Sequence, residues 1–441
     1  MIWKTVKLGD YCKKIGSGAT PKGGSMVYIS QGTSLIRSQN VYNLYFEYSG
    51  LTHITKEAAQ KLDGVTIQEN DILLNITGDS VARVCIVPID VIPARVNQHV
   101  AIIRTNTSLN AKYLVYYLAS PKMQAYMLNL AVGKGASRNA LTKGMIEDFP
   151  LVLPPIETQK KIADILSAYD DLIENNQKQI KLLEEAAQRL YKEWFVDLHF
   201  PGHESTPITD GIPQGWKKDL IGNLIDKSYR SKQVMTSGYL QEGKIPIIDQ
   251  SRDFIGGYTN DTETLVDLGK PVIVFGDHTR ILKYIQFPFA KGADGTQLII
   301  SKCGNMPQPL LYLSLLNVDL SNYHYARHFK YLKAEQIIVP DIQTAETFVS
   351  FIIPIFQKVQ ILRDQIHNAR QARDRLLPKL MNGEIEVSMD KKETVKIDNF
   401  DYIRKHWRNT PYNKDLPLAA RSTGDISEET LEKLKEIAEE E

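Results

Sequence analysis

Short loops rich in arginine, asparagine and glutamine recur between apolar runs in the first third of the chain. Their polar side chains are Arg37, Gln39, Asn40, Thr77, Asp79, Arg83, Asn97, Gln98, Lys134, Ser137, Arg138 and Asn139. The fork of an arginine matches the two acceptors of guanine in the major groove, and the amide of asparagine or glutamine matches adenine. The same groups also hold phosphates. These loops therefore predict contacts to double-stranded DNA, although ordinary solvated turns have the same composition.

A second set of such loops lies between residues 229 and 328. Its candidate DNA contacts are Arg230, Lys232, Gln250, Arg252, Asp277, His278, Thr279, Arg280, Lys291, Thr296 and Arg327. Glycines beside several of them allow a ligand to approach the backbone closely. Tyr325 and Phe329 flank Arg327 and could stack on a base, but aromatic residues at this spacing are equally common in cores.

The known motifs for nucleotide hydrolysis and base methylation are absent from the sequence. Neither Gly133-Lys134 nor Gly243-Lys244 is followed by serine or threonine, so no phosphate-binding P-loop is present. The one Pro-Pro pair, within residues 153–156, lacks the amide residue that an amino-methyltransferase needs beside a flipped base. We therefore expect no catalysis and no cofactor in this chain.

Two groups of acidic residues and histidines have a catalytic and a structural interpretation. Asp277 and His278 could form an acid-base pair, and Asp319, His324 and His328 could form a metal cluster. Neither group has a nucleophile or a ligand spacing that supports the chemistry. Structural hydrogen bonding is the favoured interpretation, and we expect no metal.

The cysteines and the start of the chain bear on its compartment. Three cysteines, far apart and in no C-x-x-C pair, predict neither disulfides nor a zinc site and favour a reducing cytoplasm. The first residues lack the apolar core of a signal peptide, and no apolar run approaches the length that spans a bilayer. We expect a cytoplasmic protein without membrane contact.

Composition and charge are those of an ordinary globular chain. Of the 441 residues, 43% are hydrophobic and 24% charged, which excludes a disordered or collagen-like protein. The formal net charge is only +1, so a basic surface has to be local. Residues 1–155 hold 16 lysines and arginines against 10 acidic residues, whereas residues 156–200 hold 6 against 9. Positive charge is therefore concentrated in the segment with the first set of loops.

The elements that position these loops follow from an internal repeat. Steps of four and three residues link Ile162, Leu166, Tyr169, Ile173, Asn176, Ile180, Leu183, Ala187, Leu190 and Trp194. At an offset of 186, the same steps link Phe348, Ile352, Ile355, Val359, Leu362, Ile366, Ala369, Arg373, Leu376 and Leu380. Each set is a heptad seam, so the sequence predicts two long helices that pair as a coiled coil.

Short β-branched runs separated by Gly, Asn and Asp turns predict strands between the helices. The runs are residues 71–76, 84–87 and 99–103 in the first copy and residues 271–275 and 297–300 in the second. Amphipathic helices are expected near residues 111–130 and 308–317. From Trp3 to Pro154 the first copy is 27 residues longer than the second, from Trp216 to Pro340, so it carries extra loops or strands.

Together these patterns predict an α+β protein with a pseudo-twofold internal repeat. Two mixed α/β domains, residues 1–155 and 201–341, alternate with two long antiparallel coiled-coil helices, residues 156–200 and 342–387. Residues 388–441 contain prolines and a glutamate-rich end, and we interpret them as a weakly packed tail. In the seams, Asn176 is expected to define register, and Arg373 to turn outward or to pair with an acidic residue.

The chain resembles the specificity subunit of type I restriction-modification systems over almost its whole length, to about Val387. Residues 153–166 are similar to the entry of the family's first central helix, and residues 194–197 to its exit. Residues 371–385 are similar to the end of the second helix, and residues 245–250 and 274–280 to a recurrent kind of target recognition domain.

This resemblance implies a non-catalytic, sequence-specific DNA-binding subunit. Each recognition domain would read one half of a bipartite DNA site, and the helices would act as spacer and as docking platform. The partners would be double-stranded DNA, two modification (methyltransferase) subunits that carry S-adenosylmethionine, and restriction/translocase subunits in the full complex. The alternative is a stand-alone bipartite DNA-binding regulator.

Overall fold

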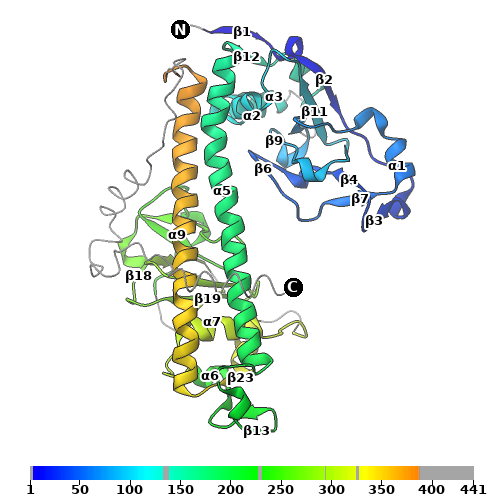
Figure 1. The fold of residues 1–441 in the computed structure, drawn as a ribbon. Coiled ribbons are helices and arrows are strands. Elements are labelled where there is room, and N and C mark those ends of the chain that lie inside the picture. The colour runs from blue at the N-terminus through cyan, green and yellow to red at the C-terminus, as the bar shows by residue number, and fades with distance from the viewer. Residues whose placement is uncertain are drawn as a thin grey trace. The chain divides into compact units, whose positions relative to one another are not determined.

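The computed structural model describes residues 3–132, 139–226, 231–293, 295–323, 327–385 and 387 (Figure 1). Its contacts divide it into two compact units. Within the described residues, the first unit consists of residues 3–177 and 364–387, and the second of residues 178–363. Each unit thus combines one globular domain with half of each long helix. The sequence predicted five segments with defined limits. These two units do not test those limits, which stay a prediction.

The first globular domain contains two four-stranded sheets and a separate strand pair. One sheet has the order β10-β4-β7-β3, the other β2-β11-β8-β9, and β1 pairs with β12. The bounds are β1 Lys4–Lys7, β2 Cys12–Ser17, β3 Tyr28–Ile29, β4 Thr33–Ile36, β7 Thr52–Ile54, β8 Ile72–Asn75, β9 Val84–Ile86, β10 Ala94–Val96, β11 Val100–Thr105 and β12 Pro150–Leu153. The predicted strands over residues 71–76, 84–87 and 99–103 are confirmed as β8, β9 and β11.

Helices and one small hairpin complete this domain. They are α1 Lys56–Gln60, α2 Ala111–Ala119, α3 Pro121–Ala131, α4 Lys143–Glu147, and the hairpin of β5 Val41–Tyr42 with β6 Tyr45–Phe46. The single helix predicted over residues 111–130 is two helices, because Ser120 has an extended backbone (ψ 146°) before Pro121. A residue before proline avoids the helical region, and proline suits the first position of a helix.

The second globular domain also contains two sheets and a separate strand pair. Its sheets have the orders β17-β16-β21-β18 and β20-β19-β22, and β15 pairs with β23. The elements are β13 Ile208–Thr209, β14 Ile212–Pro213, β15 Lys217–Leu220, α6 Ile221–Leu224, β16 Ile245–Ile248, β17 Gly257–Thr259, β18 Leu265–Val266, β19 Val272–Gly276, β20 Leu282–Ile285, β21 Phe289–Lys291, β22 Thr296–Ile299, α7 Gln308–Leu316, α8 His328–Ala334 and β23 Gln336–Val339. The predicted strands at 271–275 and 297–300 and the helix at 308–317 are confirmed.

Six strands have the same arrangement in both domains. In chain order, β4, β7, β8, β9, β10 and β11 correspond to β16, β17, β19, β20, β21 and β22. The parallel pair β4–β10 is matched by the parallel pair β16–β21, and the antiparallel pair β8–β11 by β19–β22. The strand pair β1–β12, which joins the two ends of the first domain, is matched by β15–β23. The internal repeat therefore extends through the domains.

The extra length of the first domain is concentrated at two places. Between β4 and β7 it has residues 37–51, with the β5–β6 hairpin, where the second domain has only residues 249–256. Between α2 and α4 it inserts α3, whereas the described residues between α7 and α8 contain no helix. The predicted excess thus forms a hairpin and a helix.

The two long helices are α5, Ile156–Tyr191, which continues into a π-helical turn at Lys192–Val196, and α9, Ile342–Met381. They run side by side in Figure 1. Most seam residues are buried, including Ile162, Leu166 and Leu380 in the first unit and Ala187 and Phe348 in the second. The heptad prediction is therefore confirmed as a helix-helix interface in each unit.

Polar contacts join the helices in both units. In the first unit, Asn176 donates a hydrogen bond to Gln365 (3.0 Å), and Arg373 forms an ion pair with Asp170. In the second unit, Arg363 pairs with Glu184 at 2.6 Å. Within the first unit the residue number on α9 falls as that on α5 rises, so the helices are antiparallel there. Arg373 pairs with an acidic residue, which is one of its two expected placements.

We expect the Asn176–Gln365 pair to contribute to the stability of the helix pair. Asn176 is 2% exposed, so Asn176→Ala deprives Gln365 of its buried partner and should lower the free energy of unfolding by about 1–3 kcal/mol. Replacement of both residues by leucine should restore most of that loss. Urea unfolding of the full chain measures both variants. An equal loss in the single and double variants would contradict this account of the pair.

One described helix, α9, has the composition of a membrane span. An 18-residue window in it has a mean hydropathy of 1.3. By length and composition alone, this helix could cross a bilayer, which contradicts the expectation from the sequence. Of that window, 44% is buried, and Ile352, Ile355 and Phe356 lie in the core of the second unit. Packing against the domain and α5 accounts for these apolar side chains without a membrane.

Candidate nucleic-acid interface

Three predicted DNA-binding loops and Asn139, the one described residue of a fourth, lie together in the first domain. The three loops follow β4, β8 and β10, and the fourth precedes α4. Thr77 Oγ1 lies 2.7 Å from His99 Nδ1, which joins the second loop to the third. Gly78 N donates to Asn139 O at 3.1 Å, which joins the second loop to the fourth. Asn75 Nδ2, just before the second loop, donates to Ser38 O at 2.8 Å, so the strand ends bring together residues 37–40, 77–83, 97–99 and Asn139.

Most of the described candidates in these loops keep part of their polar surface exposed. Gln39, Asp79, Gln98 and Asn139 are exposed, whereas Arg37, Thr77, Arg83 and Asn97 are partly buried. Several are held in place by local bonds. Arg37 donates to Gly50 O at 2.8 Å, Asn97 Oδ1 accepts from His99 N at 3.1 Å, and Thr20 donates to the Gln98 side chain. Lys134, Ser137 and Arg138 lie outside the described residues.

Asn40 has a structural role in this domain. It is fully buried, its Oδ1 accepts from Arg37 N at 3.0 Å, and its Nδ2 donates to Glu47 O at 2.8 Å. Its amide therefore holds the loop around residues 37–47 and presents no edge to a base. The prediction that Asn40 contacts DNA is corrected on this ground.

A pair of neighbouring variants separates the structural residue from the surface residue. Asn40→Ala leaves buried backbone groups without partners, so we expect a loss of about 2–3 kcal/mol in the free energy of unfolding. Gln39→Ala removes an exposed side chain and should change stability by less than about 0.5 kcal/mol. Thermal or urea unfolding of both variants tests this difference. If Asn40→Ala unfolds like the unmodified chain, the assigned structural role is wrong.

The second domain brings equivalent loops together. The loops after β16, β19 and β21 correspond to those after β4, β8 and β10. His278 N donates to Gln250 Oε1 at 3.1 Å, and Thr279 Oγ1 donates to Gln250 O at 2.8 Å. Asp277 N donates to Gly295 O at 2.7 Å, which joins the third loop. In each domain, three of the loops selected by composition thus occupy equivalent connections of the fold.

Exposure divides the candidates of the second domain into two groups. Arg252, His278, Thr279, Arg280 and Arg327 are exposed, and Gln250 is partly buried. Lys232 is also exposed, but its ammonium group pairs with Asp261 at 2.9 Å and with Glu263 at 2.7 Å, which offsets its charge. Arg230 lies outside the described residues.

Three candidates of the second domain are buried, and their role as DNA contacts is corrected. Asp277 is 3% exposed and its Oδ1 accepts from Phe329 N at 2.7 Å, at the start of α8. Thr296 is fully buried and donates to Ala293 O at 3.0 Å. Lys291 is 7% exposed, and burial lowers its pKa. All three side chains lie in the interior, and those of Asp277 and Thr296 hydrogen-bond to backbone groups of neighbouring segments.

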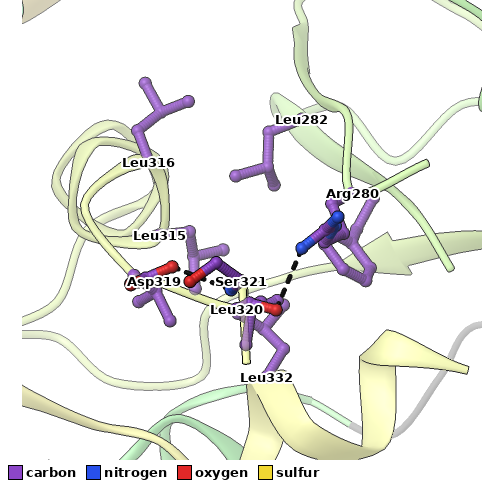
Figure 2. Close-up of a pocket in the computed structure, with 10 residues that line it drawn as sticks. Arg280, Leu282, Leu315, Leu316, Asp319, Leu320, Ser321 and Leu332 are labelled. Carbon is purple, nitrogen blue, oxygen red and sulfur yellow. Dashed lines mark hydrogen bonds between the residues drawn. The ribbon is translucent and has the colours of Figure 1, made fainter. Parts of the chain in front are cut away.

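Arg280 lines a small cavity of about 260 Å³ (Figure 2). Its guanidinium donates to Leu320 O at 2.9 Å, and leucine side chains such as Leu282, Leu315 and Leu332 form much of the remaining wall. Figure 2 shows this guanidinium directed at the turn that contains Leu320. The side chain therefore ties the 277–280 loop to residues 318–321.

Asp277 and His328 have structural hydrogen-bond partners, whereas His324 lies outside the described residues. The Asp277 carboxylate accepts from the backbone of Phe329, so it is engaged in the start of α8. Both ring nitrogens of His328 lie near backbone carbonyls, 2.8 Å from Asp277 O and 3.0 Å from Tyr323 O. Within the described part of the chain, no three side chains of His, Cys, Asp or Glu form a group that could hold a metal.

Sequence reasoning missed an aromatic group beside the loops of the first domain. The guanidinium of Arg83 lies 4.4 Å from the ring centroid of Tyr42, and the ring of Tyr45 lies 6.1 Å from that of Tyr42. Both tyrosines are exposed. The tyrosine-rich segment 42–48 was a visible signal in the sequence, but its pairing with Arg83 depends on tertiary structure.

Comparison with known proteins agrees with this architecture. A family model described as "Type I restriction modification DNA specificity domain" matches residues 2–185. The MjaIX type I restriction enzyme specificity subunit of Methanocaldococcus jannaschii is 26% identical over 414 residues, covering 87% of this chain and 94% of the relative. Over residues 2–185 the chain is similar to the DNA specificity domain of type I restriction-modification systems. The resemblance stated from the sequence is thereby confirmed.

Two further similar proteins align with most of the chain. The MjaVIII specificity subunit of the same organism is 22% identical and covers 87% of this chain and 93% of the relative. The crystal structure of the S subunit from M. genitalium superposes with a TM-score of 0.55 at 15% identity, covering 88% of this chain and 97% of that chain. This likeness confirms the predicted fold class.

Proposed function

We propose that this chain supplies the DNA address of a type I restriction-modification complex, with each globular domain reading one half of a bipartite site. The observation that supports this most is the matched placement of polar loops on three equivalent connections in two domains with the same arrangement of six strands. Two similar readers with different loop residues suit a site with two different halves. Specificity then belongs to loop side chains such as Gln39, Gln98 and Arg252.

The long helices are proposed to act as spacer and docking platform. α5 has 36 residues, which at 1.5 Å per residue is about 54 Å, more than one turn of a DNA duplex. Large apolar side chains lie exposed beside the seams: Leu172, Leu182, Phe351, Ile353 and Ile361. Exposed apolar groups of this kind mark surfaces for protein partners. We assign them to the contact with two modification subunits.

The chemistry of the complex is proposed to reside in the partners. The modification subunits would bind S-adenosylmethionine and methylate adenine, and restriction/translocase subunits would join for cleavage. This chain would contribute recognition alone and would act in the cytoplasm, where the DNA is. Its own sequence lacks the motifs for nucleotide hydrolysis and amino-methylation, which is consistent with that division.

A reconstitution tests this function. The chain is mixed with the modification subunit encoded beside it, the assembly is sized by native mass spectrometry, and bound duplexes are selected from a random pool. We expect one copy of this chain with two modification subunits and recovery of one split sequence. Tight sequence-specific binding by the chain alone, with no assembly, would instead indicate a stand-alone regulator.

A further inference from the structure

The two insertions of the first domain contact each other and the loop that precedes β9. Asn43, in the β5–β6 hairpin, donates from Nδ2 to Gln124 Oε1 on α3 at 3.2 Å. Asn43 Oδ1 accepts from Val84 N at 3.1 Å, and Gln124 Nε2 donates to Ala82 O at 2.9 Å. The hairpin and α3 therefore hold the residues on both sides of Arg83.

The backbone of the loop is fixed in the same place. Ala82 has a positive φ of 73°, and its N–H donates to Asn75 O at 2.9 Å. Arg83 O accepts from Asn75 N at 2.9 Å. A left-handed residue at position 82 turns the chain sharply, so the direction in which Arg83 leaves the loop is set by β8, the hairpin and α3 together.

The Arg83 side chain lies over an exposed aromatic ring. Its guanidinium is 4.4 Å from the ring centroid of Tyr42, which is 39% exposed. Contact with a ring face leaves the N–H groups at the edge of the guanidinium available to acceptors in its own plane. The ring also limits the rotamers of a long side chain, which reduces the entropy lost when the arginine binds a ligand.

Among the described residues, Arg83 forms no ion pair with a carboxylate, whereas Arg95 and Arg104 pair with Asp63 and Asp71. The guanidinium therefore combines a fixed position, a free hydrogen-bonding edge and a full positive charge. An acceptor pair such as a guanine edge or a phosphate fits these three properties.

The second domain has no such arginine at this place. Its counterpart of Ala82 is Arg280, which also has a positive φ, 62°, and whose N–H donates to the last residue of β19. The next residue, at the position of Arg83, is Ile281. The Arg280 guanidinium is directed to Leu320 O, and the hairpin that would supply an aromatic ring is absent from the described residues between β16 and β17.

We propose that Arg83, stacked on Tyr42 and held by the hairpin and α3, contacts DNA within the half-site of the first domain. This inference rests on the proposed function, because it assigns a residue to one of its two readers. Tyr42 and Gln124 are positioning residues in it. The hairpin and α3 therefore give the first domain a contact that the second domain lacks.

The test compares five single variants in the assembled complex with its modification subunit. Arg83→Ala removes the contact, Arg83→Lys keeps the charge but not the fork, and Tyr42→Leu removes the ring. Tyr42→Phe preserves the ring, and Lys112→Ala, on the surface of α2, is the control for loss of one positive charge. Binding is measured with three duplexes, which carry the intact site, an altered first half or an altered second half.

We expect Arg83→Ala to weaken binding of the intact site about tenfold to a hundredfold. Tyr42→Leu should weaken it about threefold to tenfold, and Tyr42→Phe and Lys112→Ala less than about twofold. If Arg83 contacts a base, Arg83→Ala relaxes discrimination at one position of the first half only. Arg83→Lys then behaves like Arg83→Ala. A phosphate contact lowers affinity for all sequences, reduces the salt dependence and is largely rescued by lysine.

Two results would overturn the proposal. Arg83→Ala could bind like Lys112→Ala, or Arg83→Ala could change discrimination in the second half alone. The stacking role would also be excluded if Tyr42→Phe and Tyr42→Leu lost binding equally and both variants had a lower unfolding midpoint. Failure of the proposed function is distinguishable, because the unmodified complex would then show no sequence-specific binding at all.

Discussion

Exchange of residues 1–155 for the first domain of a related specificity subunit should change one half of the recognised site and leave the other half intact. The reading loops of each unit are connected within that unit by hydrogen bonds such as Thr77–His99 and His278–Gln250. Both ends of the exchanged segment meet in the β1–β12 pair, where Lys4 lies opposite Leu153. The new domain therefore brings its own closing strands and leaves α5 unchanged.

The expected effect of this exchange is large. Several mismatches at about 1–3 kcal/mol each remove binding to the original first half almost completely. Selection of bound duplexes or mapping of methylated bases identifies both halves of the new site. The reciprocal exchange of residues 201–341 is the matched control and should alter only the second half. A change of both halves in either chimera would contradict independent reading.

Arg373→Ala should strongly destabilise the helix pair of the first unit. The variant leaves Asp170 as a partly buried carboxylate, 25% exposed, for which the Tyr116 hydroxyl is the one remaining side-chain donor among the described residues. Removal of one member of a buried ion pair costs about 3–5 kcal/mol, and the partial exposure reduces the expected loss to about 2–4 kcal/mol. Unfolding by urea measures it, and Arg375→Ala, on the exposed side of α9, is the control.

This loss should depend on pH in a defined direction. Burial raises the pKa of Asp170 above 3.8, and Arg373 and Tyr116 oppose that rise. Loss of the guanidinium raises the pKa further, so the folded variant binds a proton more readily than the unfolded chain. A raised carboxyl pKa contributes stability at low pH that disappears as pH rises through it. The loss should therefore be smaller at pH 5 than at pH 8. A loss independent of pH would indicate that the effect is one of packing alone.

The helices were the most predictable part of the fold. Ten seam positions in each helix repeat at four and three residues, and that period follows from helix geometry without tertiary information. The buried strands were also predictable, because β8 and β19 are continuous apolar runs bounded by turn residues. The break between α2 and α3 has a local signal in Pro121 that a purely periodic argument overlooks.

The location of the candidate loops was predictable, but the exposure of single residues was not. Gln39 and Asn40 are neighbours of similar chemistry, yet only Gln39 is exposed. Burial of Asn40 follows from backbone groups at residues 37 and 47 that become neighbours only after folding. Thr296 is buried for the same kind of reason. Composition identifies a polar loop, but tertiary hydrogen bonds decide which side chains line its interior.

The Arg83–Tyr42 contact illustrates a second limit. Three strands, β6, β7 and β8, lie between the two residues in the sequence, and the residues meet because the β5–β6 hairpin packs beside β9. The extra length of the first domain was visible in the alignment of its two copies, but its division into a hairpin and α3 required the structure. A stacked arginine in one domain and an inward-directed one in the other is a difference that composition does not reveal.

The most direct test of the central claim is a map of N6-methyladenine on host DNA. The modification subunit is expressed alone or with this chain, and methylated positions are read by single-molecule sequencing. We predict a split motif that appears only when both proteins are present, which would also identify the two half-sites. A stable complex that produces no new motif, or the same motif without this chain, would contradict its role as the specificity subunit.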